Sequence, residues 1–153
     1  MRPIATNRRV DREELEAFVA PRHHGVLLTT RADGRPQASL VTMGLSEGRI
    51  LVSSYPERAK VHNLRRDPRA SMVVMSDEFG GEWVQVDGEA EVVLPPDSVE
   101  GLVEYFRCIS GEHPDWAEYR QAMLDQGKCV IRLSIERWGP IAKGGFPARL
   151  ADG

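Results

Sequence analysis

The fold is decided by the stretch VLLTTRADGRPQASLVTMGL, residues Val26–Leu45. It contains two strand-like segments, Val26–Arg31 and Gln37–Leu45, separated by the polar residues ADGRP. Asp33-Gly34 favours a tight turn, because both residues tolerate the positive φ that hairpin turns require. The stretch therefore predicts two antiparallel strands joined by a short loop.

More strands are expected on the C-terminal side of this hairpin. After a second turn, SEG, the segment Arg49–Ser54 predicts a third strand, which would complete an antiparallel meander. Ser71–Met75, Glu82–Leu94 and Lys128–Ile135 supply three further strands.

The longest of these segments, Glu82–Leu94, alternates in polarity. Trp83, Gln85 and Asp87 fall on one side and two valines on the other, as in a strand with one buried face. Gly88 interrupts the alternation and predicts a bulge or bend.

Helices are predicted between the strands by caps, prolines and apolar spacing. They cover Asp11–Val19, a segment from Pro56 that ends at Asp67-Pro68, a segment from Pro95 through Phe106, and His113–Leu124. The tail from Glu136 is rich in Gly and Pro, so we expect it to be irregular. We therefore expect residues 1–153 to form one domain, a six-stranded antiparallel β-barrel with helices outside it.

Composition narrows the class of protein. The chain has 153 residues, 41% of them hydrophobic and 28% charged, which is typical of a globular protein and argues against disorder. A net charge of -3 and a pI of about 5.8 argue against general nucleic-acid binding. Cys108 and Cys129 are expected to be buried thiols. Because no signal-peptide core and no membrane-length apolar run is found, we expect a cytoplasmic protein.

One local stretch is basic in this acidic chain. PERAKVHNLRRDPRAS, residues 56–71, holds five Arg or Lys residues against two acids. Arg58 and Lys60 follow a strand that ends in Ser53-Ser54, and a helix start after a strand can bind phosphate through free backbone N–H groups. The same charges could instead cover a solvated helix face, and the local pattern leaves both interpretations open.

Other candidate groups have structural interpretations. Arg65, Arg66 and Arg69 lie at the predicted helix end, where cations complement the helix dipole. Asp115, between His113 and Trp116, is expected to stabilise a helix start.

No metal site or familiar catalytic motif is predicted. His23 and His24 are adjacent on an extended chain, so their side chains should point to opposite faces rather than ligate one metal. The sequence has no G-x-G-x-x-G motif, Walker loop or G-x-S-x-G elbow.

The order of these segments resembles a known superfamily. The run GVLLTTRADGRPQASLV, ILVSS, ERAKVHNLRRDPRASMVV and WVQVDGEAEVV is similar to the split β-barrel flavin and deazaflavin oxidoreductases, which include pyridoxamine 5'-phosphate oxidase. RAK and NLRRDPRAS, with the helical segment YFRCISGEHPDWAEYRQAML, resemble the actinobacterial branch that uses the deazaflavin coenzyme F420. The resemblance extends over roughly residues 25–133.

The resemblance implies a cofactor site and a homodimer. It matches the phosphate-binding segment to Arg58, Ala59 and Lys60, and the strand end beside it to Ser53 and Ser54. It also matches the ring-binding strand to Val41, Thr42 and Met43, and the interface strand to Trp83 and Gln85. Members are homodimers whose two sites lie between the subunits. The tail does not match, which leaves Trp138, Lys143 and Arg149 as candidates for the substrate side.

The expected activity is hydride transfer from reduced coenzyme F420 to a small organic acceptor, and we name no catalytic residue. A cofactor that carries the chemistry needs only binding and orientation from the protein. An FMN-dependent oxidase is the alternative, since FMN would use the same cations. A non-catalytic haem binder, with His23, His24 or His62 as axial ligand, is a second alternative. A module that binds RNA or protein through the basic helix is a third.

Overall fold

The structure, a computed structural model, describes residues 5–145. Its strands are β1 (Thr6–Arg8), β2 (His24–Thr30), β3 (Pro36–Thr42), β4 (Gly44–Ser46), β5 (Arg49–Ser54), β6 (Arg69–Met75), β7 (Trp83–Val93), β8 (Cys129–Trp138) and β9 (Ile141–Lys143). Its helices are α1 (Arg12–Val19), α2 (Ala59–Arg66), α3 (Val99–Ser110) and α4 (Trp116–Gln126).

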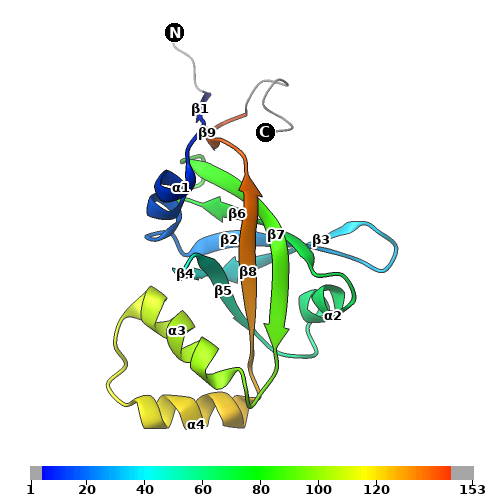
Figure 1. The fold of residues 1–153 in the computed structure, drawn as a ribbon, viewed down its shortest axis with the longest axis vertical. Coiled ribbons are helices and arrows are strands. Elements are labelled where there is room, and N and C mark those ends of the chain that lie inside the picture. Colours follow the sequence, from blue (N-terminus) through cyan, green and yellow to red (C-terminus); the bar gives the residue numbers. More distant parts are fainter. Residues whose placement is uncertain (1–4, 146–153) are drawn as a thin grey trace.

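The strands form one antiparallel sheet in the order β3-β2-β6-β7-β8-β5-β4 (Figure 1). β3 and β4 lie at opposite ends of this order, yet a single residue, Met43, joins them in the chain. The two edges of the sheet must therefore meet at Met43, and the sheet curls into a split barrel. This confirms the predicted fold class, although the described residues contain nine strands rather than six.

The predicted meander is wrong. The segment Gln37–Leu45 was expected to be one strand between its two sequence neighbours, but it is divided at Met43. Its first part pairs with β2 and its second part with β5. The cause is that Met43 is fully buried, and its backbone N–H donates to the His23 carbonyl, so the chain turns the barrel corner there. Local turn residues do not reveal such a corner.

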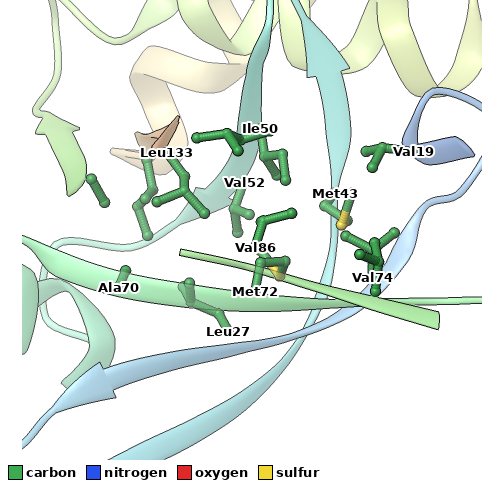
Figure 2. Close-up of a cluster of buried hydrophobic side chains, with 14 of the residues drawn as sticks. Val19, Leu27, Met43, Ile50, Val52, Ala70, Met72, Val74, Val86 and Leu133 are labelled. Atoms are coloured by element: carbon green, nitrogen blue, oxygen red, sulfur yellow. The ribbon is translucent and has the colours of Figure 1, made fainter. Parts of the chain in front are cut away.

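The barrel interior is filled by aliphatic side chains from β2, β5, β6, β7 and β8 (Figure 2). Leu27, Met72 and Val86 point toward Val52 and Met43 from neighbouring strands in this cluster. The predicted alternation of β7 is confirmed, since Val84 and Val86 are fully buried. The pairing of β7 with β8 shifts at Asp87/Gly88, which confirms the predicted bulge.

The helices flank the barrel. α1 begins with the predicted capping box, in which Asp11 accepts from the Glu14 backbone N–H and the Glu14 side chain accepts from the Asp11 N–H. α3 packs against β4, and α4 packs against α3 (Figure 1). α2 starts at Ala59 rather than at Pro56, and it ends at Arg66 with Asp67 as its C-cap, so the predicted stop at Asp67-Pro68 is confirmed.

The C-terminal segment is more regular than expected. β8 continues to Trp138, and β9 pairs with β1 from the other end of the chain and with Trp83 of β7. The expectation of an irregular tail from Glu136 is therefore wrong for the part that is described, and residues 146–153 lie outside it. The pairing of β1 with β9 could not be predicted from the sequence, because each strand has only three residues, too few to show an alternation of polar and apolar side chains. Within residues 5–145, we find no helix with the length and apolarity needed to cross a membrane.

Candidate functional site

Three chain segments meet at one end of the barrel: the end of β5, the start of α2 and the start of β8. Ser54, the last residue of β5, pairs with Cys129, the first residue of β8. α2 begins five residues after Ser54, and its Lys60 interacts electrostatically with Cys129. We call this region the β5–α2 junction.

The two serines of the junction face opposite ways. Ser54 shares its side of the sheet with the fully buried Cys129, and it is only 6% exposed. Its hydroxyl is buried and has no hydrogen-bond partner among residues 5–145. Ser53 lies on the other side, near the Tyr105 hydroxyl of α3. Ser54, rather than Ser53, therefore shares a face with Cys129, the neighbour of Lys60.

Lys60 is half-buried at the junction. Burial lowers the pKa of its ammonium group, and the positive charge of Arg58 lowers it further, while the nearby Cys129 opposes the shift. The partly buried Lys60 and the exposed Arg58 therefore repel each other. An anion placed between them would remove that repulsion.

The start of α2 is also favourable for an anion. The first N–H groups of an α-helix have no acceptor within the helix. The N-cap position is Arg58, whose side chain does not cap the helix. The first turn, which begins at the exposed Ala59, contains no acidic residue. The Val61 and His62 N–H groups already donate to the Arg58 carbonyl. The N–H groups of Ala59 and Lys60, together with the helix dipole, therefore favour a negative ligand here.

Two residues that sequence reasoning missed complete the junction. The Arg58 guanidinium lies 5.8 Å from the centroid of the Tyr55 ring, and the Lys128 ammonium lies 5.5 Å from the same centroid. Tyr55 could have been noticed, since it directly follows the two serines. Lys128 could not, because only the pairing of β5 with β8 brings it there.

Two of the other arginines of the basic stretch, Arg66 and Arg69, have structural contacts, as expected. Arg66 donates to the Thr30 carbonyl and to the Asn63 side chain. Arg69 donates to Asp67 through two nitrogens, and this side-chain hydrogen bonding lowers the pKa of Asp67 to about 2. Only the first half of the basic stretch reaches the junction.

The predicted ring-binding strand lies beside an open groove on the outer face of the barrel. Val41 and Thr42 line this groove with Leu40 and Phe79, whereas the Met43 side chain is fully buried in the core. Met43 can therefore present only its backbone, whose carbonyl contacts the His23 ring nitrogen at 2.9 Å. The Thr42 carbonyl accepts a hydrogen bond from Tyr105 at 2.9 Å.

Trp83 and Gln85 lie far from the junction within one chain. They line an outer groove of about 540 Å³, next to the one beside Val41, and the Trp83 ring donates to the Gly144 carbonyl. Trp83 is the first residue of β7, whereas Val93 at its other end pairs with Val130 beside the junction. An eleven-residue strand separates the two places by roughly 30 Å.

The histidines proposed as haem ligands have other surroundings. His23 contacts the Met43 carbonyl, His24 lies 3.3 Å from an Asp77 oxygen, and His62 is exposed on α2. His113 accepts from the Asp115 N–H, and Asp115 caps α4, as the structural interpretation expected. Among residues 5–145, no three His, Cys, Asp or Glu side chains are grouped to hold a metal ion.

Three residues of the C-terminal segment, Trp138, Lys143 and Arg149, were candidates for the substrate side, and the two that the structure describes have different contacts. The Trp138 ring donates to the Val10 carbonyl and so ties β8 to the N-terminal segment. Lys143 is exposed on β9 and pairs with Thr6. Arg149 lies outside the described residues.

The family follows from these features together with one comparison. The chain folds into a split barrel with a cationic strand–helix junction, and its residues 11–142 match the family model described as pyridoxamine 5'-phosphate oxidase. The chain belongs to the pyridoxamine 5'-phosphate oxidase family.

Solved structures of other proteins share this family fold. A conserved hypothetical protein of Mycobacterium tuberculosis is 24% identical with a TM-score of 0.72, and the match covers 91% of this chain and 90% of that one. An F420 reductase is 18% identical with a TM-score of 0.59, covering 80% of this chain and 94% of that one. A haem-binding protein of Mycobacterium smegmatis is 25% identical with a TM-score of 0.66, covering 91% of this chain and 56% of that one.

Proposed function

We propose that this family member is an oxidoreductase that binds coenzyme F420 with its phosphate at the β5–α2 junction. The observation that carries the proposal is the half-buried Lys60, which interacts electrostatically with Arg58 and with Cys129, the strand partner of Ser54. Arg58 and Lys60 each offer hydrogen-bond donors to an anion. The resemblance to an F420 reductase supports the choice of cofactor.

The residues present fit the phosphate of such a cofactor. Arg58 offers a planar pair of donors, Lys60 a point charge, and Ala59 an exposed backbone at the uncapped helix start. When bound in its reduced form, the deazaflavin supplies a hydride to an organic acceptor. The protein binds and orients the cofactor, and Val41 and Thr42 are the proposed contacts for its ring.

The proposed site needs two chains. Arg58 and Lys60 are separated from Trp83 and Gln85 by the length of β7. A homodimer that packs the outer faces of two barrels together would bring Trp83 and Gln85 of one subunit toward the cofactor held by the other. The outer face is suited to this contact, since Leu40 is 86% exposed and Phe79 is 95% exposed there.

FMN and haem are the competing ligands. FMN carries a phosphate for the same cations. Haem is suggested by the Mycobacterium smegmatis relative. The contacts of His23 and His24 do not decide against haem, because each contact involves Nδ1 only, and an axial histidine commonly donates its second ring nitrogen to such an oxygen.

A comparison of the three ligands tests the proposal. The wild-type protein is titrated with coenzyme F420, FMN and haem, and binding is followed by fluorescence and absorbance. We expect coenzyme F420 to bind most tightly. Protein that is purified with FMN already bound would overturn the choice of deazaflavin.

A further inference from the structure

A third cation stands beside the proposed phosphate site. Lys128 lies against the ring of Tyr55, and the Arg58 guanidinium lies against the same ring. We propose that Lys128 and Tyr55 form a second anion subsite, which takes a carboxylate that the cofactor carries beyond its phosphate. The inference rests on the proposed function.

Lys128 is held at this place by its backbone. Its N–H donates to the Met123 carbonyl, and its carbonyl accepts from the Ser98 hydroxyl at 2.7 Å. Ser98 is fully buried, and Gly127 before Lys128 has the left-handed conformation that ends α4. The ends of two helices therefore fix where the lysine side chain begins.

The pairing of β5 with β8 explains why Lys128 meets Tyr55. Ser54 pairs with Cys129 at the end of both strands, and the same register continued by one residue would place Tyr55 opposite Lys128. Successive residues of a strand point to opposite faces, and Lys60 is close to Cys129. Lys60 and Lys128 thus approach Arg58 from opposite sides of the sheet end.

This arrangement favours a ligand with two separate negative groups. A single terminal phosphate bound by Arg58 and Lys60 leaves Lys128 without an anionic contact from the ligand. A phosphodiester that continues into a glutamyl chain brings a carboxylate farther along. Glu57, an exposed residue whose charge acts on Cys129, is the acidic residue nearest in sequence to this group and would favour the cations in the absence of ligand.

The test compares two forms of one ligand. Coenzyme F420 with its glutamyl residues and the same coenzyme trimmed of them are titrated into wild-type, Lys128→Ala and Lys60→Ala protein. Arg65→Ala is the control, since Arg65 is an exposed cation in the last turn of α2.

We expect Lys128→Ala to weaken binding of the full coenzyme by roughly threefold to tenfold and to leave binding of the trimmed form unchanged. Lys60→Ala should weaken both forms equally, and Arg65→Ala should weaken neither. Tyr55→Phe should retain the preference for the full coenzyme, whereas Tyr55→Leu should lose it, because leucine offers the two cations no aromatic ring.

The outcomes separate the two proposals. If wild-type protein binds the two forms with equal affinity, or Lys128→Ala weakens both alike, the second subsite is overturned while the phosphate site stands. If wild-type protein binds neither form, the proposed function fails, and the subsite fails with it.

Discussion

Lys60 is the most important residue of the proposed phosphate site. Its pKa is lowered from the ordinary 10.5 by burial and by Arg58. The charged form binds an anion, so binding is complete below this lowered pKa and declines as the pH rises through it. We expect the affinity for coenzyme F420 to fall with a midpoint below pH 10.5, measured by titration from pH 7 upward.

Lys60→Arg is the control for this pH dependence. Arginine stays charged over the whole range, while Cys129, Arg58 and Glu57 around it are unchanged. The decline should therefore disappear in the variant. A decline of the same size in both proteins would assign the titration to another group.

Arg58 and Lys60 could be proposed from the sequence because the signal lies in neighbouring residues: two serines, a proline and closely spaced cations. The sequence alone does not tell which of Ser53 and Ser54 faces the junction, because that depends on the pairing of β5 with β8, in which Ser54 lies opposite Cys129. Lys128 could not be predicted for the same reason, because only this strand pairing brings it to the junction.

The contact between α3 and β4 depends on one glycine. A Cβ on Gly44 would collide with the Cys108 sulfur. We expect Gly44→Ala to lower the free energy of unfolding by about 1–3 kcal/mol, the usual cost of overpacking, as measured by urea denaturation.

Cys108→Ala supplies the second half of a double-mutant cycle. Removing the sulfur leaves the Cys108 Cβ at 3.5 Å from the added carbon, so the double variant should regain much of the loss. Equal losses in Gly44→Ala and in the double variant would show that the sulfur does not fix this packing.

Helices and strands could be predicted where a few neighbouring residues determine where they begin or end. The capping box at Asp11 and the Asp67-Pro68 stop gave α1 and the end of α2 correctly. The split of the second strand at Met43 was missed, because burial at a barrel corner is a property of the closed sheet. The pairing of β1 with β9 was missed because it joins the two ends of the chain.

The outer face of the whole barrel is the proposed dimer contact. Leu40 on β3 is almost fully exposed in the single chain. We expect Leu40→Glu to produce a monomer in sedimentation experiments with unchanged circular dichroism, because a buried unpaired charge at an interface is costly.

Leu124→Glu on α4 is the matched control, since Leu124 is an exposed leucine (41%) away from that face. It should leave the dimer intact. A wild-type protein that sediments as a monomer would contradict the two-chain site.

The central claim is that the β5–α2 junction binds the phosphate of coenzyme F420. Fluorescence titration of Arg58→Ala and Lys60→Ala tests it most directly, with Arg65→Ala as the control cation at the other end of α2. We predict that each of the first two loses roughly 1.5–3 kcal/mol of binding free energy, about tenfold or more in affinity, and that the control loses little. Wild-type affinity in both Arg58→Ala and Lys60→Ala would contradict the account.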